Sequence, residues 1–247
     1  MDAKVILLFL SGVLAGFINI MAGGGSLITI PMLIFLGLPA TVANGTNRVA
    51  VLVQNIFATA KFKQKGLFYW KTGLILTLPA VLGAVVGSQI AVSISDALFK
   101  RILAVVLIAS LGLVLINKNK AVERVHEVKI KNHAPFVLAF FLIGIYGGMI
   151  QAGVGFVIIL VLAMAPGLSL LQINSLKIFI ILCYMVPSLF IFFTHDKIHW
   201  LYGLVLAAGN ALGGWLGVVA AVKKGDKLIR IIFAIAVLGM AIKLGLG

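Results

Sequence analysis

The stretch Asn19–Pro31 reads NIMAGGGSLITIP, and it places three consecutive glycines inside a long apolar run. Each glycine costs a helix interior about 1 kcal/mol relative to alanine. If this run lies in a membrane, no water satisfies the freed backbone groups, so the irregular backbone must line a cavity or pack inside protein. The stretch therefore predicts a helix that breaks at Gly23–Gly25, with a second helix beginning near Ser26.

The composition predicts an all-α polytopic membrane protein. The 247 residues are 62% hydrophobic and 11% charged, whereas soluble domains are about 25% charged. Apolar runs such as ILTLPAVLGAVVGSQIAV (75–92) are long enough to cross a bilayer, which takes ~20 residues. The N-terminal MDAKVILLFLSGVLAGF lacks the basic region and cleavage site of a signal peptide, so we expect it to be retained as a membrane segment.

Several classes of function are disfavoured. The single Cys183 excludes an internal disulfide framework and a cysteine metal site. The net charge of +14 is explained by basic loops between spans, so we expect no nucleic-acid partner. No HExxH, no GxSxG and no intramembrane His–Asp pairing is present, so we expect no enzyme activity, no metal and no cofactor.

The sequence matches itself without a gap at an offset of 130 residues. AGGGSLI (22–28) lies over AGVGFVI (152–158). The rarer residue types match as well: Trp70 over Trp200, Asn44 over Asn174, and Asp96 over Asp226. We interpret this as a duplication, with a first repeat at 1–117, a connector at 118–133 and a second repeat at 134–247.

Each repeat has the same predicted parts. A broken apolar segment comes first, at 4–38 and at 134–168. Three continuous helical spans follow in each repeat, at 44–62, 68–92 and 97–117, then at 173–193, 199–222 and 228–246.

The basic residues predict that the two repeats are inverted, because Lys and Arg accumulate in cytoplasmic loops. Residues 61–71 carry four lysines, but the equivalent 191–201 carry one. Residues 223–230 carry four basic residues, but the equivalent loop has only Lys100 and Arg101. The bias therefore changes sides between the repeats.

Inversion requires an odd number of crossings in each repeat, and the three continuous spans supply it. The second arm of the second broken segment, 156–166, spans about 16 Å and cannot cross a core of ~30 Å. We therefore predict re-entrant hairpins with their glycine tips inside the membrane. The loops at 61–71 and 222–230 and the connector would be cytoplasmic, and both termini external.

Inverted repeats with broken helices are typical of secondary transporters, which hold substrate near the membrane midplane at half-helix ends. Helices that begin at about Ser26 and Phe156 would aim two N-termini, which favour anions, at one central cavity. Glycine lets a ligand approach the backbone closely.

These residues resemble the sulfite exporter TauE/SafE family, within the toluene-sulfonate uptake permease group. GGGSLITIPMLIFLGLPATVANGTN carries the resemblance in the first repeat, and GVGFVIILVLAMAPGLSLLQINSLK is its weaker echo in the second. The resemblance covers nearly the whole chain. It implies transport of sulfur-containing anions, such as sulfite or organosulfonates, across the bacterial inner membrane.

Polar and glycine residues in the apolar segments are the candidate substrate-binding residues. They are Asn19, Gly23, Gly24, Gly25, Ser26, Asn47, Gln54, Gln151, Gly153, Gly155 and Lys177. Asn19 and Gln151 either contact the ligand or satisfy backbone freed by the breaks. Lys177 either faces an anion or snorkels to the cytoplasmic surface, and Arg48 has the same ambiguity.

Other polar residues have simpler interpretations. We expect Asn44 and Asn174 to be helix N-caps, and the glycines at 83–87 and 209–217 to serve close helix packing. Of Gln54 and Asn55, one is expected to face the cavity and the other a neighbouring helix.

The expected function is export of a small anion held mainly by neutral donors, with Lys177 assisting entry. No span carries a buried Asp or Glu, so the usual parts of a proton relay are missing. The alternative is an importer or a channel for small anions. The expected partners are the anion and the lipid bilayer, and the sequence leaves a homo-oligomer open.

Overall fold

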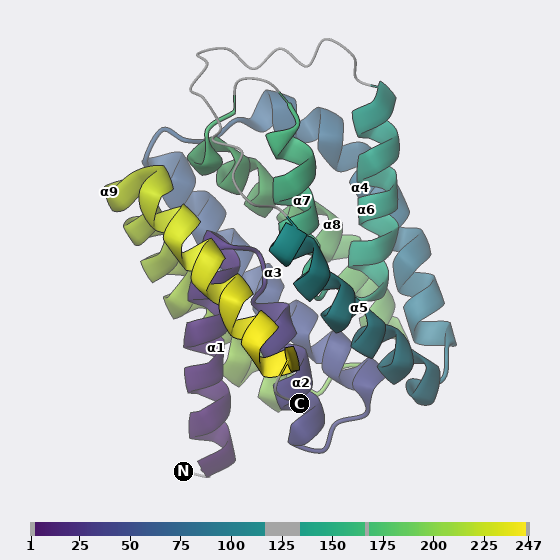
Figure 1. The fold of residues 1–247 in the computed structure, drawn as a ribbon. Coiled ribbons are helices and arrows are strands. Elements are labelled where there is room, and N and C mark those ends of the chain that lie inside the picture. The colour runs from purple at the N-terminus through teal and green to yellow at the C-terminus, as the bar shows by residue number, and fades with distance from the viewer. Residues whose placement is uncertain (1–2, 117–133, 166–167, 246–247) are drawn as a thin grey trace.

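The structure is a computed structural model, and it describes residues 3–116, 134–165 and 168–245. The predicted connector at 118–133 lies outside these residues. The described residues form helices and no strands. The helices are α1 (Ala3–Met21), α2 (Ser26–Phe35), α3 (Ala40–Gln64), α4 (Trp70–Ser93), α5 (Asp96–Ile116), α6 (Ala134–Met149), α7 (Val154–Ala163), α8 (Leu170–Thr194) and α9 (Trp200–Gly245) (Figure 1).

The membrane character is confirmed by helix length and apolarity. Within the described ranges, four helical stretches are long and apolar enough to cross a bilayer: Ala3–Met21, Gly73–Ser93, Leu170–Thr194 and Trp200–Lys223. The second arms of both broken segments are too short to do so, because α2 and α7 have 10 residues each and span about 15 Å.

The helices of the two halves pack against each other in matching pairs. α1 packs mainly on α9, and its equivalent α6 packs on α4. Likewise α3 packs on α9, and its equivalent α8 packs on α4. The first helix of each half is therefore seated on the other half, so the halves are interlocked and do not form separate bodies.

Glycines make these pairings close, as predicted for 83–87 and 209–217. On α4, a Cβ added at Gly83 or Gly87 would lie 2.0 Å from a carbonyl oxygen of α6. On α9, a Cβ added at Gly213 would lie 2.0 Å from the carbonyl oxygen of Val13 on α1. Small residues allow such backbone contact between membrane helices, where no hydrophobic effect drives association.

Both predicted breaks are present, and the chain turns back at the first one. α1 ends at Met21 and α2 begins at Ser26. Gly23 has φ +89°, a conformation in which a side chain is strained. A Cβ at Gly25 would lie 2.4 Å from the carbonyl oxygen of Ala15, more than a turn before the end of α1, so α2 starts alongside α1.

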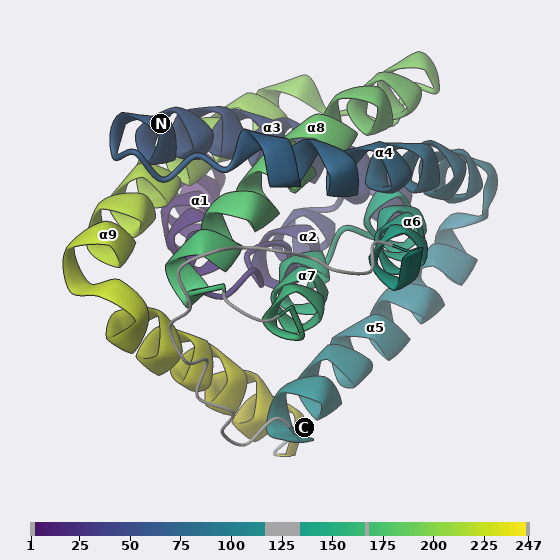
Figure 2. The same cartoon turned by 90° about the horizontal axis from the view of Figure 1, so that it is seen from above.

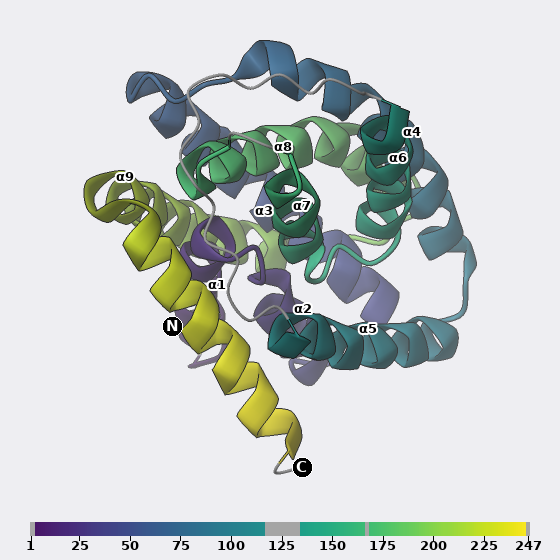
Figure 3. The ribbon, with the colours of Figure 1, turned by 45° about the horizontal axis from the view of Figure 1, so that its top comes forward.

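The prediction of separate spans at 199–222 and 228–246 is wrong in one respect. Residues 223–227, expected to be a loop, are helical, and α9 runs without interruption from Trp200 to Gly245. Figures 2 and 3 show that α9 changes direction sharply part-way and that its last part runs back toward α5, with which it is in contact. The segment between the two expected spans contains no proline to end the helix.

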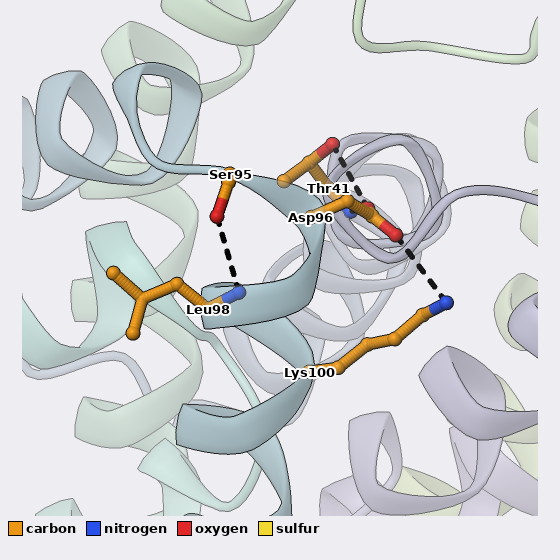
Figure 4. Close-up of polar contacts among 5 residues, drawn as sticks. All are labelled: Thr41, Ser95, Asp96, Leu98 and Lys100. Atoms are coloured by element: carbon orange, nitrogen blue, oxygen red, sulfur yellow. Dashed lines mark hydrogen bonds and ion pairs between the residues drawn. The ribbon is translucent and has the colours of Figure 1, made fainter.

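A carboxylate joins the starts of α3 and α5 (Figure 4). Asp96 accepts a hydrogen bond from the Thr41 backbone N–H at 2.9 Å and forms an ion pair with Lys100 at 3.4 Å. The neighbouring Ser95 hydroxyl accepts from the Leu98 N–H at 3.3 Å. These bonds satisfy N–H groups at two helix starts, which have no partner within their own helix.

Candidate functional site

The two helix breaks meet inside the protein. A Cβ placed on Gly23 would lie 2.4 Å from the carbonyl carbon of Gly155, and one on Gly155 would lie 2.4 Å from the Gly23 Cα. Only two glycines allow backbones this close. The starts of α2 and α7 therefore lie together, one from each half.

Each second arm begins with unsatisfied donors, as every helix does. In α2 the N–H groups of Leu27 and Ile28 donate to the carbonyls of Gly24 and Gly25, both at 3.0 Å. The preceding N–H groups, up to Ser26, lie outside the hydrogen bonds of the helix itself. The positive end of the helix dipole lies at the same place.

Asn47 holds the start of α2 from α3. Its amide nitrogen donates to the Ser26 hydroxyl at 3.0 Å, and its amide oxygen accepts from the Thr29 hydroxyl at 2.6 Å. All three side chains are buried. The candidate residues Ser26 and Asn47 are thus brought together, and Asn47 fixes the orientation of the Ser26 hydroxyl beside the break.

Lys177, at the equivalent position of α8, caps the end of α1. Its ammonium donates to the backbone carbonyls of Asn19 and Ile20, each at 3.0 Å, and to the side-chain oxygen of Asn174 at 2.6 Å. Lys177 is 1% exposed, so the alternative that it snorkels to the surface is wrong. A cation at a helix C-terminus stabilises it by up to ~2 kcal/mol in a partly buried geometry.

Arg48 on α3 does the same for α6. Its guanidinium donates to the carbonyls of Gly147 at 3.3 Å and Gly148 at 2.5 Å, and to the Ser188 hydroxyl at 2.6 Å. It also lies 4.3 Å from the centroid of the Phe192 ring, within the range of a cation–π contact. Arg48 is buried and was not among the predicted site residues.

The sequence held a partial signal for this pair of caps. Each half has one basic residue in the first half of its next long helix: Arg48 on α3, which follows α2, and Lys177 on α8, which follows α7. The positions differ by one in the repeat alignment, and only the fold shows that each cation reaches the broken helix of the other half.

The predicted N-caps are wrong. α3 begins at Ala40 after Pro39, which places Asn44 inside the helix, where its amide donates to the Met149 carbonyl at 2.8 Å. α8 is instead capped by Ser169, whose side chain and that of Gln172 form a capping box. Asn174 therefore lies beyond the first turn, which leaves its side chain free to accept from Lys177.

The two amides near the breaks differ in their partners. Gln151, which has φ +65°, accepts a hydrogen bond from the Tyr184 hydroxyl at 3.1 Å. Asn19 is buried at the end of α1, where its backbone carbonyl accepts from Lys177. Gly24 and Gly25 lie at the first break and Gly153 at the second, where it precedes α7 with φ +73°.

Gln54 and Asn55 differ in their partners, although the Gln54 amide nitrogen is also buried without one. That one of them faces a cavity stays a prediction. The Gln54 amide oxygen accepts from Asn210 of α9 at 3.1 Å, which is a contact between helices. Both amide atoms of Asn55 are buried without a hydrogen-bond partner. Such groups are rare in native proteins.

Comparison with known proteins agrees with this description. The sequence model for the family described as Sulfite exporter TauE/SafE matches residues 8–244. The Probable membrane transporter protein ORF9 of Sinorhizobium sp is 30% identical over 240 residues, which cover 96% of this chain and 90% of that protein. A Probable membrane transporter protein of Haemophilus influenzae is 29% identical, with coverage of 91% and 88%.

The Probable membrane transporter protein YfcA of Escherichia coli K12 is 26% identical over 96% of this chain and 88% of its own length. No solved structure matches the chain. A family match over nearly the full length, together with apolar helices long enough to cross a bilayer, establishes a multi-pass membrane transporter. The chain belongs to the sulfite exporter TauE/SafE family.

Proposed function

We propose that this protein exports small sulfur-containing anions, such as sulfite or organosulfonates, across the bacterial inner membrane. The observation that carries the proposal is the contact between Gly23 and Gly155, which brings two helix starts to one point. The positive dipole ends of two helices favour an anion there. The description of the family supplies the sulfur chemistry.

The site would use neutral donors for direct contact. The Ser26 hydroxyl and the amides of Asn19 and Gln151 lie at or beside the breaks. Protein backbone fills the space beside Gly23, Gly25 and Gly155, so Gly24 and Gly153 would be the glycines that a ligand approaches. Asn47 would act by holding Ser26. Gln54 is bonded to Asn210 of α9, so it would support the site without contacting the ligand.

The two halves would form inverted repeats with re-entrant hairpins, so that the tips reach the membrane midplane from opposite sides. The matched packing of α1 on α9 and α6 on α4 supports this arrangement. The short α2 and α7 support it too, because a 15 Å arm reaches only to mid-membrane. In this arrangement the first arm α1, which is long enough to cross the bilayer alone, would begin outside the hydrocarbon core.

An exported anion needs no proton relay. An inside-negative potential supplies about 2.3 kcal/mol per charge per 100 mV for outward movement. The described spans contain no buried carboxylate that could carry protons, consistent with movement driven by potential and concentration.

Flux in proteoliposomes tests the proposal. Purified protein is reconstituted, the vesicles are loaded with sulfite, isethionate, sulfoacetate or chloride, and efflux is followed under an imposed inside-negative potential. We expect efflux of sulfur oxyanions well above that from protein-free vesicles. Absence of flux for every anion in either direction would overturn the proposal, and flux against a gradient of one anion driven by another would distinguish a carrier from a channel.

A variant at the first break connects the flux to the site. Gly24→Leu should abolish efflux while membrane insertion stays intact, because a large side chain fills the approach to the tip. Gly37→Leu is a control at the other end of α2, where an added Cβ meets nothing within 4 Å. Its φ of +99° strains any side chain, so flux retained in this variant would show that backbone strain alone does not stop transport. Flux at the wild-type rate in Gly24→Leu would show that the tip does not line the pathway.

A further inference from the structure

Two buried cations flank the point where the breaks meet. Lys177 is bonded to the last turn of α1, which leads into Gly23, and Arg48 to the last turn of α6, which leads into Gly155. Both side chains are almost completely inaccessible. A buried charge without a partner is costly, so what balances these two charges is a question about the site.

The hydrogen bonds of Lys177 require its charged form, and Arg48 is charged as well. The Lys177 nitrogen has three oxygen acceptors, at 3.0, 3.0 and 2.6 Å. Only an ammonium has three N–H groups to donate, whereas a neutral amine has two. Arginine stays protonated in proteins.

No carboxylate neutralises them within the part of the chain whose side chains are described. The carboxylates there are Asp96 and Asp196. Asp96 is engaged by Thr41 and Lys100 at the starts of α3 and α5. Asp196 is exposed in the turn between α8 and α9.

The helix dipoles do not neutralise them either. At each break a helix C-terminus, equivalent to about −0.5 charge, lies beside a helix N-terminus, equivalent to about +0.5. Summed over each break these ends offset each other, although a ligand in contact with either N-terminus still meets its positive end. What remains around the meeting point is the charge of the two cations, about two positive.

We propose that the site formed where the breaks meet is built for a divalent anion, with Lys177 and Arg48 as its fixed counter-charges. The inference rests on the proposed function and names the charge class of its substrate. Lys177 attracts the anion electrostatically and not by direct contact, because its three N–H groups are all bonded to protein oxygens. Arg48 retains a buried Nε–H without a partner. This assigns Lys177 a role different from the assistance to entry that the sequence suggested.

The magnitude follows from Coulomb's law. At ~10 Å and an effective dielectric constant of ~20, one fixed charge changes the affinity for each unit of ligand charge by on the order of tenfold. Removing one cation should therefore lower the affinity for a divalent anion about tenfold more than the affinity for a monovalent anion of the same size.

The experiment compares two sulfonates of similar size, sulfoacetate with two negative charges and isethionate with one. Half-saturation concentrations for both are measured in proteoliposomes at neutral pH for wild type and Lys177→Gln. Wild type should prefer sulfoacetate, and Lys177→Gln should lower the ratio of the two affinities on the order of tenfold. Lys177→Arg, which keeps the charge, should preserve the ratio even if both affinities fall.

Further variants separate charge from structure. Lys63→Gln removes the same charge from an exposed position and should leave the ratio unchanged. Arg48→Lys keeps the charge of the second site and should also keep the ratio. A purely structural defect in Lys177→Gln would weaken both sulfonates equally.

An unchanged ratio in Lys177→Gln, or a wild type that prefers isethionate, would overturn the inference while leaving an anion transporter in place. Transport of neither sulfonate, nor of sulfite, by wild type would instead reject the proposed function itself.

Discussion

Closing the small space between the two breaks should disturb both breaks at once. In Gly155→Ala the new Cβ would lie 2.4 Å from the Gly23 Cα and 2.6 Å from its carbonyl oxygen. Both are backbone atoms that cannot rotate away, so the breaks must separate by about 1 Å to reach an ordinary contact. Overpacking of this kind costs about 1–3 kcal/mol.

Gly23→Ala should cost more, because it adds backbone strain to the same collision. Its φ of +89° costs a residue with a Cβ about 1–2 kcal/mol. Gly37→Ala is the control, since Gly37 has φ +99° but nothing within 4 Å of an added Cβ. The difference between these two variants isolates the collision.

The double variant Gly23→Ala/Gly155→Ala provides the decisive comparison. Once one Cβ has separated the breaks, the second meets less resistance, so the combined loss should fall short of the sum by about 0.5–3 kcal/mol. The free energy of unfolding is measured at equilibrium in mixed micelles for all four proteins of the cycle. Additivity within ~0.5 kcal/mol would refute the contact between Gly23 and Gly155.

Three further predictions follow from the fold. Single cysteines at Lys63 and Lys223, both exposed, in a Cys183→Ala background should both be labelled from the cytoplasmic side alone; labelling from opposite sides would reject the inverted repeats. Asn47→Ala should lower stability by about 1–3 kcal/mol, because it removes the amide partner of two buried hydroxyls of α2, and should slow sulfite flux; unchanged flux would show that the start of α2 needs no such support. Partial burial raises the pKa of Asp96, but the Thr41 N–H and Lys100 outweigh it and hold the pKa below its usual range. The stabilisation by the Asp96 carboxylate is therefore present at neutral pH and lost as pH falls through that lowered pKa. The thermal stability of Asp96→Asn, measured against pH, should lack this loss at acid pH. Identical pH profiles of Asp96→Asn and wild type would contradict this.

The positions of the breaks could be predicted from sequence because glycine disfavours helix in a local, additive way. The triplet Gly23–Gly25 located the first break directly. The repeat then located the second, where Val154 and Phe156 replace two of the matching residues. Helix bounds followed from apolar length, since a bilayer sets that length.

The cross-linking caps could not be predicted, because they depend on which helices meet. Nothing local in Lys177 or Arg48 indicates that each reaches carbonyls at the end of a helix more than 90 residues away. The true cap of α8 was readable, since Ser169 and Gln172 have the spacing of a capping box. Asn174 was interpreted as the N-cap instead, because asparagine is also a common N-cap residue.

The continuity of α9 could not be predicted from the sequence pattern either. The polar run 223–227 resembles a loop in composition, yet lysine has a high helix propensity. Polarity marks where a segment leaves the hydrocarbon, whereas propensity decides whether the helix ends there.

Direct location of a bound anion tests the central claim that the meeting point of the breaks is the substrate site. The protein is crystallised in lipid with selenite, the heavier analogue of sulfite, and the selenium is located by its anomalous scattering. The account predicts a selenium peak within hydrogen-bonding reach of the N–H groups at the start of α2 and α7 and of the Ser26 hydroxyl. A well-occupied peak elsewhere in the membrane region, with the start of both helices empty, would contradict it.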